Sequence, residues 1–215
     1  MALPDHLLAG YGRFRTGRYA QDEETYRTLG GGSQQPKLMI IACCDSRAAP
    51  ETIFDAGPGE IFVMRNVANL VPPYAPDGKH HSTSAALEFA VLSLGVKDIL
   101  VMGHGRCGGI RAVVEGGDPL SASDFIGKWM GDVRDVAEAV KVDHDHAHDG
   151  DLQTAVEHAS VEHSLANLRT FPWLRMRENK GEIGLHGAWF DISLGELHAY
   201  DETGRSWSVV DARPV

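Results

Sequence analysis

The segment Lys37-Leu-Met-Ile-Ile-Ala-Cys43 decides the fold, because every residue after the lysine is apolar. A continuously apolar strand is typical of a parallel sheet that helices cover on both faces. Further buried strands are expected at Glu60–Arg65 and Asp98–Met102, with helices at Pro50–Asp55 and Ser82–Leu94. This alternation of strand and helix predicts an α/β fold with a mainly parallel central sheet flanked by helices.

The first residues have a different pattern. Residues 3–29 favour two helical pieces that are broken near Gly10–Gly17, with apolar residues at helical spacing. Such an apolar strip needs a partner surface. We therefore expect residues 1–32 to form an N-terminal helical arm that mediates dimerisation, and residues 33–215 to form a single α/β domain.

The second half of the chain favours helices over residues 121–142 and 151–170. After them, Gly184–Ser193 and Glu196–Tyr200 resemble two strands joined by a turn. We expect this pair to be an antiparallel addition that contributes an edge strand of the sheet.

Composition excludes several classes of partner. The chain of 215 residues has 20 Lys and Arg against 30 Asp and Glu, a net charge of −10. So acidic a chain is a poor ligand for nucleic acid or a membrane surface, and we expect neither partner. Its apolar runs are far shorter than the roughly 18 residues that span a bilayer. With no secretory signal visible at Met1, a cytoplasmic protein is expected.

Three residues suggest a metal site. The chain has only three cysteines, too few for a disulfide framework, so free thiols are expected. Cys43 ends the first predicted strand, His104 ends the third, and Cys107 follows shortly after. Ligands bind at the carboxyl ends of parallel strands, where these side chains are expected to meet. Two thiolates and one imidazole form a catalytic type of zinc site with a fourth position open.

Two charged residues lie beside the first of these cysteines. Asp45 and Arg47 either form a local ion pair or place a carboxylate beside the metal, held by the arginine. Zinc with two thiolates and a neutral imidazole has no net charge, so it should acidify water less than a centre with three histidines. We therefore expect activity that rises with pH and is poor in mild acid.

Two motifs show a family resemblance. Cys43-Cys44-Asp45-Ser46-Arg47 resembles the Cys-x-Asp-Ser-Arg motif of β-class carbonic anhydrases, and Gly103-His-Gly-Arg-Cys-Gly-Gly-Ile110 resembles their Gly-His-x-x-Cys-Gly-Gly motif. The segment Pro58-Gly-Glu-Ile-Phe-Val-Met-Arg-Asn-Val-Ala-Asn-Leu-Val-Pro-Pro73 is similar to the plant-type subgroup. The similarity runs from about residue 34 to residue 115.

The resemblance implies reversible hydration of carbon dioxide to bicarbonate and a proton, a lyase activity in which zinc-bound hydroxide is the nucleophile. It implies Cys43, His104 and Cys107 as zinc ligands, and Asp45 with Arg47 as the catalytic pair. It also implies a homodimer or a multiple of dimers. The implied substrate-binding residues are Gln34, Phe62, Val67, Phe89 and Gly108.

The sequence departs from the plant-type pattern near this pocket. Phe89 replaces a tyrosine, and Ser93 replaces a histidine that has been proposed to carry protons. These changes affect the route of proton export more than the zinc chemistry. Ile40 replaces the tryptophan of the bicarbonate-regulated bacterial subgroup, which disfavours a regulatory bicarbonate site.

Other functions remain open from the sequence. The same chemistry would suit a zinc hydrolase acting on carbonyl sulfide or carbon disulfide, and a non-catalytic zinc-binding homologue would keep the same ligands. A redox pair of Cys43 and Cys44 is disfavoured, since adjacent cysteines rarely form a disulfide. The His-rich stretch Asp143–Asp149 is interpreted as a solvated loop.

Overall fold

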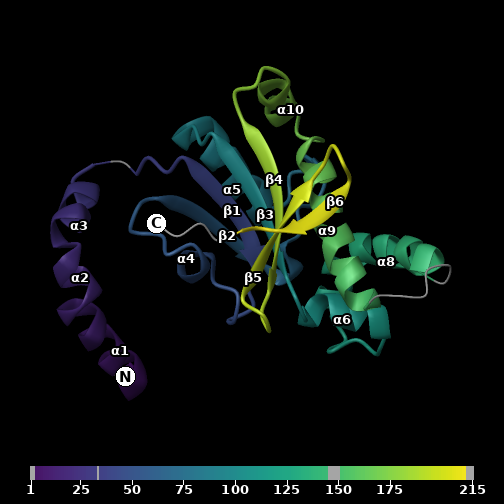
Figure 1. The fold of residues 1–215 in the computed structure, drawn as a ribbon, viewed down its shortest axis with the longest axis horizontal. Coiled ribbons are helices and arrows are strands. Elements are labelled where there is room, and N and C mark those ends of the chain that lie inside the picture. Colours follow the sequence, from purple (N-terminus) through teal and green to yellow (C-terminus); the bar gives the residue numbers. More distant parts are fainter. Residues whose placement is uncertain (1–2, 33, 145–150, 212–215) are drawn as a thin grey trace.

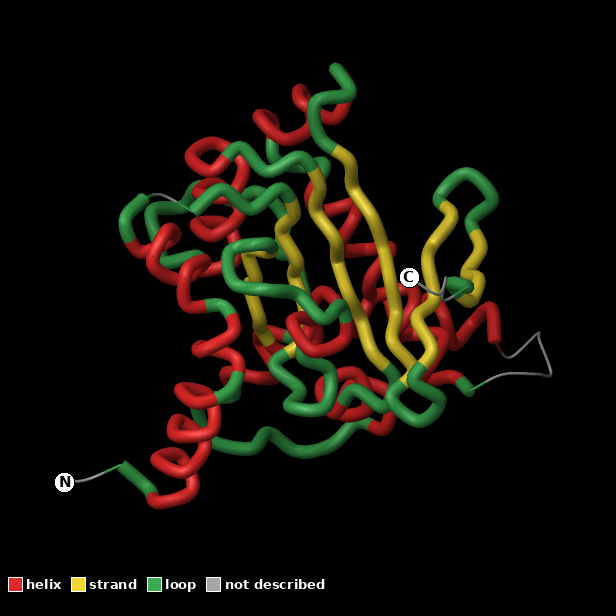
Figure 2. The backbone as a smooth tube through the Cα atoms, turned by 60° about the vertical axis from the view of Figure 1, so that its left-hand side comes forward, coloured by secondary structure: helices red, strands yellow, loops and turns green. Residues whose placement is uncertain are grey.

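The computed structural model describes residues 3–32, 34–144 and 151–211. Within these residues lies one six-stranded sheet in the order β2-β1-β3-β4-β5-β6 (Figure 2). Strands β1 to β4 pair in parallel, whereas β5 and β6 are antiparallel additions at one edge. The strands are β1 (Leu38–Cys43), β2 (Ile61–Asn66), β3 (Asp98–His104), β4 (Gly184–Asp191), β5 (Glu196–Asp201) and β6 (Ser206–Val209). The predicted α/β class with a mainly parallel sheet is confirmed.

Helices connect and cover the strands (Figure 1). The α-helices are α1 (Asp5–Thr16), α2 (Arg18–Gln21), α3 (Glu23–Gly30), α4 (Pro50–Ile53), α5 (Ser82–Glu88), α6 (Gly108–Glu115), α7 (Phe125–Trp129), α8 (Gly131–His144), α9 (Leu152–Leu168) and α10 (Pro172–Asn179). A short 3₁₀ turn, η1 (Val67–Asn69), follows β2, and a π-helical segment, η2 (Phe89–Leu94), continues α5. In the described part of the chain, no helix is both long and apolar enough to cross a membrane.

The C-terminal strands differ from the prediction. The predicted pair of strands is present, but its first strand, β4, pairs in parallel with β3 and so joins the sheet as a parallel strand. The connection from β3 to β4, which comprises helices α6 to α10, is a crossover that returns the chain in the direction of β3. Only β5 pairs with β4 in the antiparallel sense that the turn signal indicated. Strand β6, at the outer edge, was not predicted.

The predicted helix boundaries also need correction. The arm breaks at Gly17, which has non-helical torsions (φ −108°, ψ −102°), whereas Gly10 lies inside α1. Helix α5 begins at Ser82, but its N-cap is His81 and no side chain caps it. The helical region predicted from residue 121 begins only with α7, and α10 was missed.

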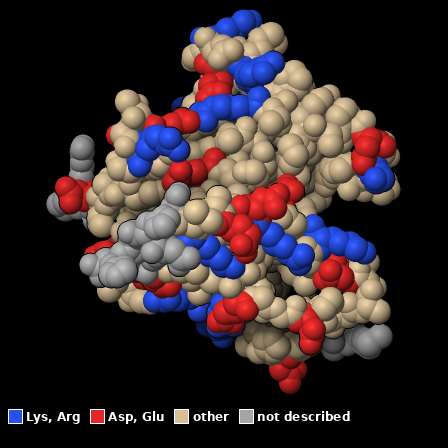
Figure 3. Space-filling model, turned by 90° about the vertical axis from the view of Figure 1, so that its right-hand side faces the viewer, with Lys and Arg blue, Asp and Glu red and all other residues tan. Residues whose placement is uncertain are grey.

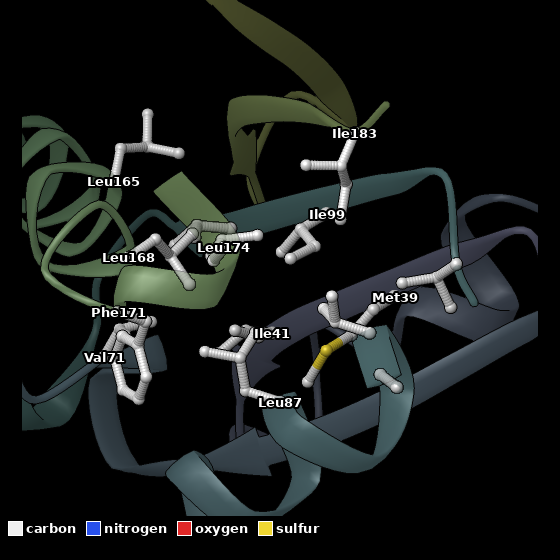
Figure 4. Packing of buried hydrophobic residues seen from close by; sticks show 14 of the residues in the cluster. Met39, Ile41, Val71, Leu87, Ile99, Leu165, Leu168, Phe171, Leu174 and Ile183 are labelled. Carbon is white, nitrogen blue, oxygen red and sulfur yellow. The ribbon is translucent and has the colours of Figure 1, made fainter. Parts of the chain in front are cut away.

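The largest core cluster lies between the sheet and helices α5, α9 and α10 (Figure 4). Alternate residues of β1 and β3, such as Met39, Ile41 and Ile99, face this layer and are fully buried. Burying one such side chain contributes roughly 1.5–3 kcal/mol to stability. Because the same strands end at Cys43 and His104, this packing fixes the strand ends that carry the metal-site residues.

The N-terminal arm, helices α1 to α3, stands away from the sheet on the side opposite α8 (Figure 1). Leu7, Leu8 and Tyr11 of α1 are exposed, and no residue of α1 is buried. Within the described residues, this apolar strip therefore stays open to solvent.

Candidate metal centre

Three buried side chains converge at the carboxyl end of the sheet. Cys43 is the last residue of β1, His104 is the last residue of β3, and Cys107 is the N-cap of α6. Their ligand atoms all lie within 4.8 Å of one another. The residues are only 5%, 1% and 2% exposed, respectively. The topology thus brings together two segments that are more than 60 positions apart in the sequence.

The imidazole of His104 is oriented for ligation. Its Nδ1 lies 2.9 Å from the carbonyl oxygen of Gly105, so Nδ1 carries the proton and donates it to that oxygen. Its Nε2 is buried and has no hydrogen-bond partner among the residues that the structure describes. A buried nitrogen with a free lone pair is costly unless something binds it. This arrangement, with the second nitrogen fixed by a carbonyl, is the one that metal-ligating histidines use.

The two thiols share one local environment. The hydrogen bond from the Cys107 thiol lowers the pKa of Cys43 to about 4, against the opposing effect of burial, with further help from His104. The same hydrogen bond, together with burial, raises the pKa of Cys107. The backbone N–H of Ala68 also donates to Sγ of Cys43, over 3.3 Å. The site therefore favours a thiolate, which is the form that binds metals.

The turn between His104 and Cys107 is tight. Arg106 has φ 59°, in the left-handed region that non-glycine residues seldom adopt. A Cβ atom at Gly105 would lie 3.0 Å from Cζ2 of Trp189, so the close approach of this loop to β4 favours glycine. The strained turn points both side chains toward Cys43.

The donor set fits zinc. Tetrahedral zinc places sulfur and nitrogen ligands at about 2.0–2.3 Å from the ion, and hence about 3.5–4 Å from one another. The three ligand atoms lie within 4.8 Å of one another, close to that spacing, and one of the two thiols is readily ionised. Three protein ligands also leave a fourth position for water or substrate, as in catalytic zinc sites.

Asp45 and Arg47 form a two-pronged ion pair beside this site. Arg47 donates from Nε to Oδ1 of Asp45 over 2.9 Å and from one terminal nitrogen to Oδ2 over 2.7 Å. This pairing holds the pKa of Asp45 well below its usual range. Oδ2 of Asp45 lies 3.9 Å from Nε2 of His104. The carboxylate is therefore ionised, held by the arginine and directed at the metal-binding position.

Arg65 is a site residue that the sequence analysis missed. From β2, it donates to the carbonyl oxygen of Cys43 over 2.8 Å and to that of Asp45 over 2.6 Å. These two bonds fix the backbone on both sides of Cys44. The one sequence signal available was a charged residue near the end of an otherwise apolar strand, which marks Arg65 as unusual but does not reveal its partners.

The structure divides the predicted substrate pocket between two places. Val67 and Gly108 line a cavity of about 900 Å³ beside the metal site. Gln34 and Phe89 line a different cavity, of about 630 Å³. Phe62 packs on Phe89, with ring centroids 6.0 Å apart. Phe62 pairs with Met39 at the amino end of β1, about 13 Å along the strand from Cys43.

Comparison with known proteins agrees with this geometry. The family model described as carbonic anhydrase matches residues 38–197, which include both motifs of the sequence analysis and all three candidate ligands. The chain belongs to the carbonic anhydrase family. Within the family it is similar to the β class: it is 37% identical over 205 residues to β carbonic anhydrase 5, chloroplastic, of Arabidopsis thaliana, covering 95% of this chain and 65% of that protein. It therefore spans just under two thirds of the length of that relative.

A bacterial relative matches over most of both chains. The carbonic anhydrase of Pseudomonas aeruginosa is 35% identical, covering 97% of this chain and 92% of that one. Among solved structures, the β-carbonic anhydrase CcaA superposes with a TM-score of 0.88 at 28% identity, covering 97% of this chain and 92% of that one. A tetrameric β-carbonic anhydrase of Sordaria macrospora superposes with a TM-score of 0.79 at 28% identity, covering 91% of this chain and 95% of that one.

Two further sequence features lie outside the metal centre. Cys44 is exposed, in contrast to its two buried counterparts. Residues 145–150 of the His-rich stretch lie outside the described residues, so the interpretation as a solvated loop stays a prediction. Figure 3 shows that the face formed around α8 carries basic and acidic side chains interspersed, and not one basic patch.

Proposed function

We propose that the protein catalyses the zinc-dependent, reversible hydration of carbon dioxide to bicarbonate and a proton. The observation that carries this proposal is the convergence of Cys43, His104 and Cys107 with an ionised, arginine-held carboxylate beside them. Membership of the carbonic anhydrase family supports the same reaction.

The side chains around the metal position have separate roles. Zinc, when bound by the three ligands, acts as a Lewis acid that makes deprotonated water available near neutral pH. Asp45 accepts a hydrogen bond from the reacting water and so orients its lone pair toward carbon dioxide. Arg47 keeps that carboxylate ionised and away from the metal as a ligand. It is itself anchored on the carbonyl oxygen of Arg106, at 3.2 Å.

The pocket for carbon dioxide requires residues from both ends of the sheet. Carbon dioxide is small and apolar, so its pocket should be apolar with few donors. Val67 and the backbone N–H of Gly108 lie on the metal side. Gln34, Phe62 and Phe89 lie at the far end of the same chain. We infer that a second copy brings its Gln34 and its two phenylalanines to the metal centre of the first.

The arm, residues 1–32, gives this pairing a physical basis. Its exposed Leu7, Leu8 and Tyr11 have no partner in one chain. Covering such a strip on another copy favours a homodimer or a multiple of dimers. The tetrameric state of the Sordaria macrospora relative is compatible with this inference. The arm of residues 1–32 would therefore serve the catalytic domain of residues 33–215 by pairing two copies of it.

A cytoplasmic location forms part of the proposal. All three cysteines are free, and the metal centre needs two of them as thiolates. A reducing compartment keeps thiols in that state.

The direct experiment measures carbon dioxide hydration by the zinc-loaded protein, the metal-stripped protein and the protein to which zinc is returned. We expect activity that is lost on stripping and regained with zinc. Carbonyl sulfide and carbon disulfide are offered in parallel as rival substrates. A zinc-loaded protein that turns over either of these but not carbon dioxide, or that is inactive on all three, would contradict the proposed function.

A further inference from the structure

A second carboxylate lies behind the metal centre and is not part of the Asp45–Arg47 pair. Glu157 of α9 is only 3% exposed. One of its oxygens, Oε1, accepts from the backbone N–H of Cys107 and from the side chain of Gln153, both over 2.9 Å. The other, Oε2, accepts from the indole N–H of Trp189 over 3.1 Å. The carboxylate thus joins the metal ligand Cys107 to helix α9 and strand β4.

The same helix holds the other side of the ligand. Nε2 of Gln153 also donates to the carbonyl oxygen of Cys107, over 3.2 Å. One residue earlier, Arg106 forms an ion pair with Asp151, the N-cap of α9. The start of α9 therefore grips both backbone polar groups of Cys107 and the side chain of its neighbour. These contacts hold the turn in which Arg106 adopts left-handed torsions, a conformation that needs support from the surrounding structure.

A carboxylate suits this position better than other acceptors. Glu157 receives three N–H donors from two directions, and an ionised carboxylate accepts on both oxygens and donates on neither. An amide in its place would present an NH₂ group to one of those N–H donors. Burying a carboxylate is costly, and three hydrogen bonds offset part of that cost. Burial accordingly raises the pKa of Glu157, against the effect of these donors.

Helix α9 provides an internal comparison. Glu162, five residues further along the same helix, is half-buried and accepts from the indole N–H of Trp207 over 3.0 Å and from the hydroxyl of Tyr200 over 3.3 Å. It shares with Glu157 the helix, the side-chain type and an indole partner. It differs in that its partners belong to the β5–β6 hairpin and not to the metal-binding turn.

We propose that Glu157 is a positioning residue for the metal centre, which holds Cys107 and the first turn of α6 so that zinc is retained. The inference rests on the assignment of Cys107 as a zinc ligand. Hydrogen-bonded partners behind metal ligands typically change metal affinity by about 10–100-fold when they are replaced. We expect a change of that size for Glu157→Gln and none for Glu162→Gln.

The experiment compares the wild type, Glu157→Gln and Glu162→Gln as full-length, zinc-loaded proteins. Zinc affinity is measured by competition with a chromophoric chelator, and the environment of the cysteines by the thiolate-to-metal absorption of the cobalt-substituted proteins. We expect about 10-fold or greater weakening of zinc binding and an altered cobalt spectrum in Glu157→Gln alone. Thermal unfolding and circular dichroism of all three proteins show whether the fold is intact.

Several results would overturn the inference. If both variants lose similar thermal stability and both retain zinc and the cobalt spectrum of the wild type, Glu157 is merely structural. If Glu157→Gln does not fold, the variant Gln153→Leu tests the inference instead. It removes the half-buried donor to the carbonyl oxygen of Cys107 and leaves Glu157 in place. We then expect a severalfold loss of zinc affinity, and an unchanged affinity contradicts the proposal. A wild-type chain that binds no zinc instead refutes the ligand assignment itself.

Discussion

The two ends of the parallel sheet differ in how complete they are. At the carboxyl end, the metal-site side chains are buried, hydrogen-bonded and brought together by one chain. At the amino end, Phe89 is 47% exposed and, with Gln34, lines a cavity separate from the one that Val67 and Gly108 line. The contrast is the one expected if a single chain holds the metal and, as we propose, a second chain completes the substrate pocket.

The physical reason lies in what each end must do. Zinc ligands need fixed positions, which the packed core behind β1 and β3 provides. A pocket for a small apolar molecule needs only an apolar wall and one or two donors, which an interface can supply. The following predictions test the two ends separately, beginning with the largest expected effect.

Removing a ligand should abolish function at the carboxyl end. Cys43→Ser should lose zinc, and carbon dioxide hydration should fall to the uncatalysed rate, because two ligands cannot hold the ion. Metal analysis and stopped-flow assays check both outcomes. Cys44→Ser is the matched control: its exposed thiol should be dispensable. Equal activity of Cys43→Ser and wild type would exclude this metal centre.

Replacing the carboxylate should separate catalysis from metal binding. Asp45→Asn should keep zinc but lower kcat/KM by about 100-fold, because the amide is uncharged and gives Arg47 only one acceptor oxygen. Zinc content and steady-state rates are measured on the same preparation. A variant with unchanged rates would remove Asp45 from the mechanism, and one without zinc would make it a structural residue.

The amino end should work in trans. We expect Gln34→Ala to lower kcat/KM about tenfold with normal zinc content. Co-expressed Gln34→Ala and Cys43→Ser chains, purified as a mixed dimer by two different tags, should recover about half of the wild-type activity. One site in such a dimer combines zinc from one chain with Gln34 from the other.

The activity of the mixed dimer distinguishes a Gln34 that serves its own chain from one that serves the partner chain. If Gln34 served the metal centre of its own chain, the zinc-containing chain would always lack it. The mixed dimer would then show at most half of the already low activity of the Gln34→Ala dimer. That result would contradict the proposed division of the pocket between two chains.

Mild acid should destabilise the fold through His158 of α9, which packs against Trp189, His198 and Trp207 of strands β4 to β6. Burial lowers the pKa of His158 to about 4, with a further contribution from His198. The unfolded chain therefore binds this proton from about pH 6.5 downward while the folded chain does not. The contribution of neutral His158 to the free energy of unfolding is fully present above about pH 6.5. It is lost as the pH falls from there to about 4.

Thermal unfolding across this pH range provides the measurement. His158 stacks on Trp207 with ring centroids 4.3 Å apart, so His158→Phe keeps an aromatic contact. We expect the variant to lose a few degrees less in Tm between pH 6.5 and pH 4.5 than the wild type. Parallel pH profiles for the two proteins would rule out this role of His158.

The sequence and the structure agree best where local pattern and topology reinforce each other. The continuous apolar run before Cys43 predicted β1, and the rule that ligands gather at strand ends predicted the convergence with His104 and Cys107. The direction of β4 was missed because its hairpin with β5 was the visible signal, while its parallel partner β3 is about 80 residues distant.

Contacts between distant segments could not be predicted in the same way. The bonds of Arg65 to Cys43 and Asp45 depend on the register of β1 and β2, which no local pattern reports. Glu157 was detectable in principle, because a carboxylate stood on the buried stripe of α9 among Val156, Ser160 and Val161. That Glu157 binds the backbone of Cys107, 50 positions away in the chain, could not be predicted from the sequence pattern.

X-ray absorption at the zinc edge of the purified wild-type protein tests the central claim most directly. Ligation by Cys43, Cys107 and His104 predicts two sulfur neighbours at about 2.3 Å and nitrogen or oxygen neighbours at about 2.0–2.1 Å. A spectrum without sulfur neighbours, or a protein that retains no zinc at all, would contradict the account.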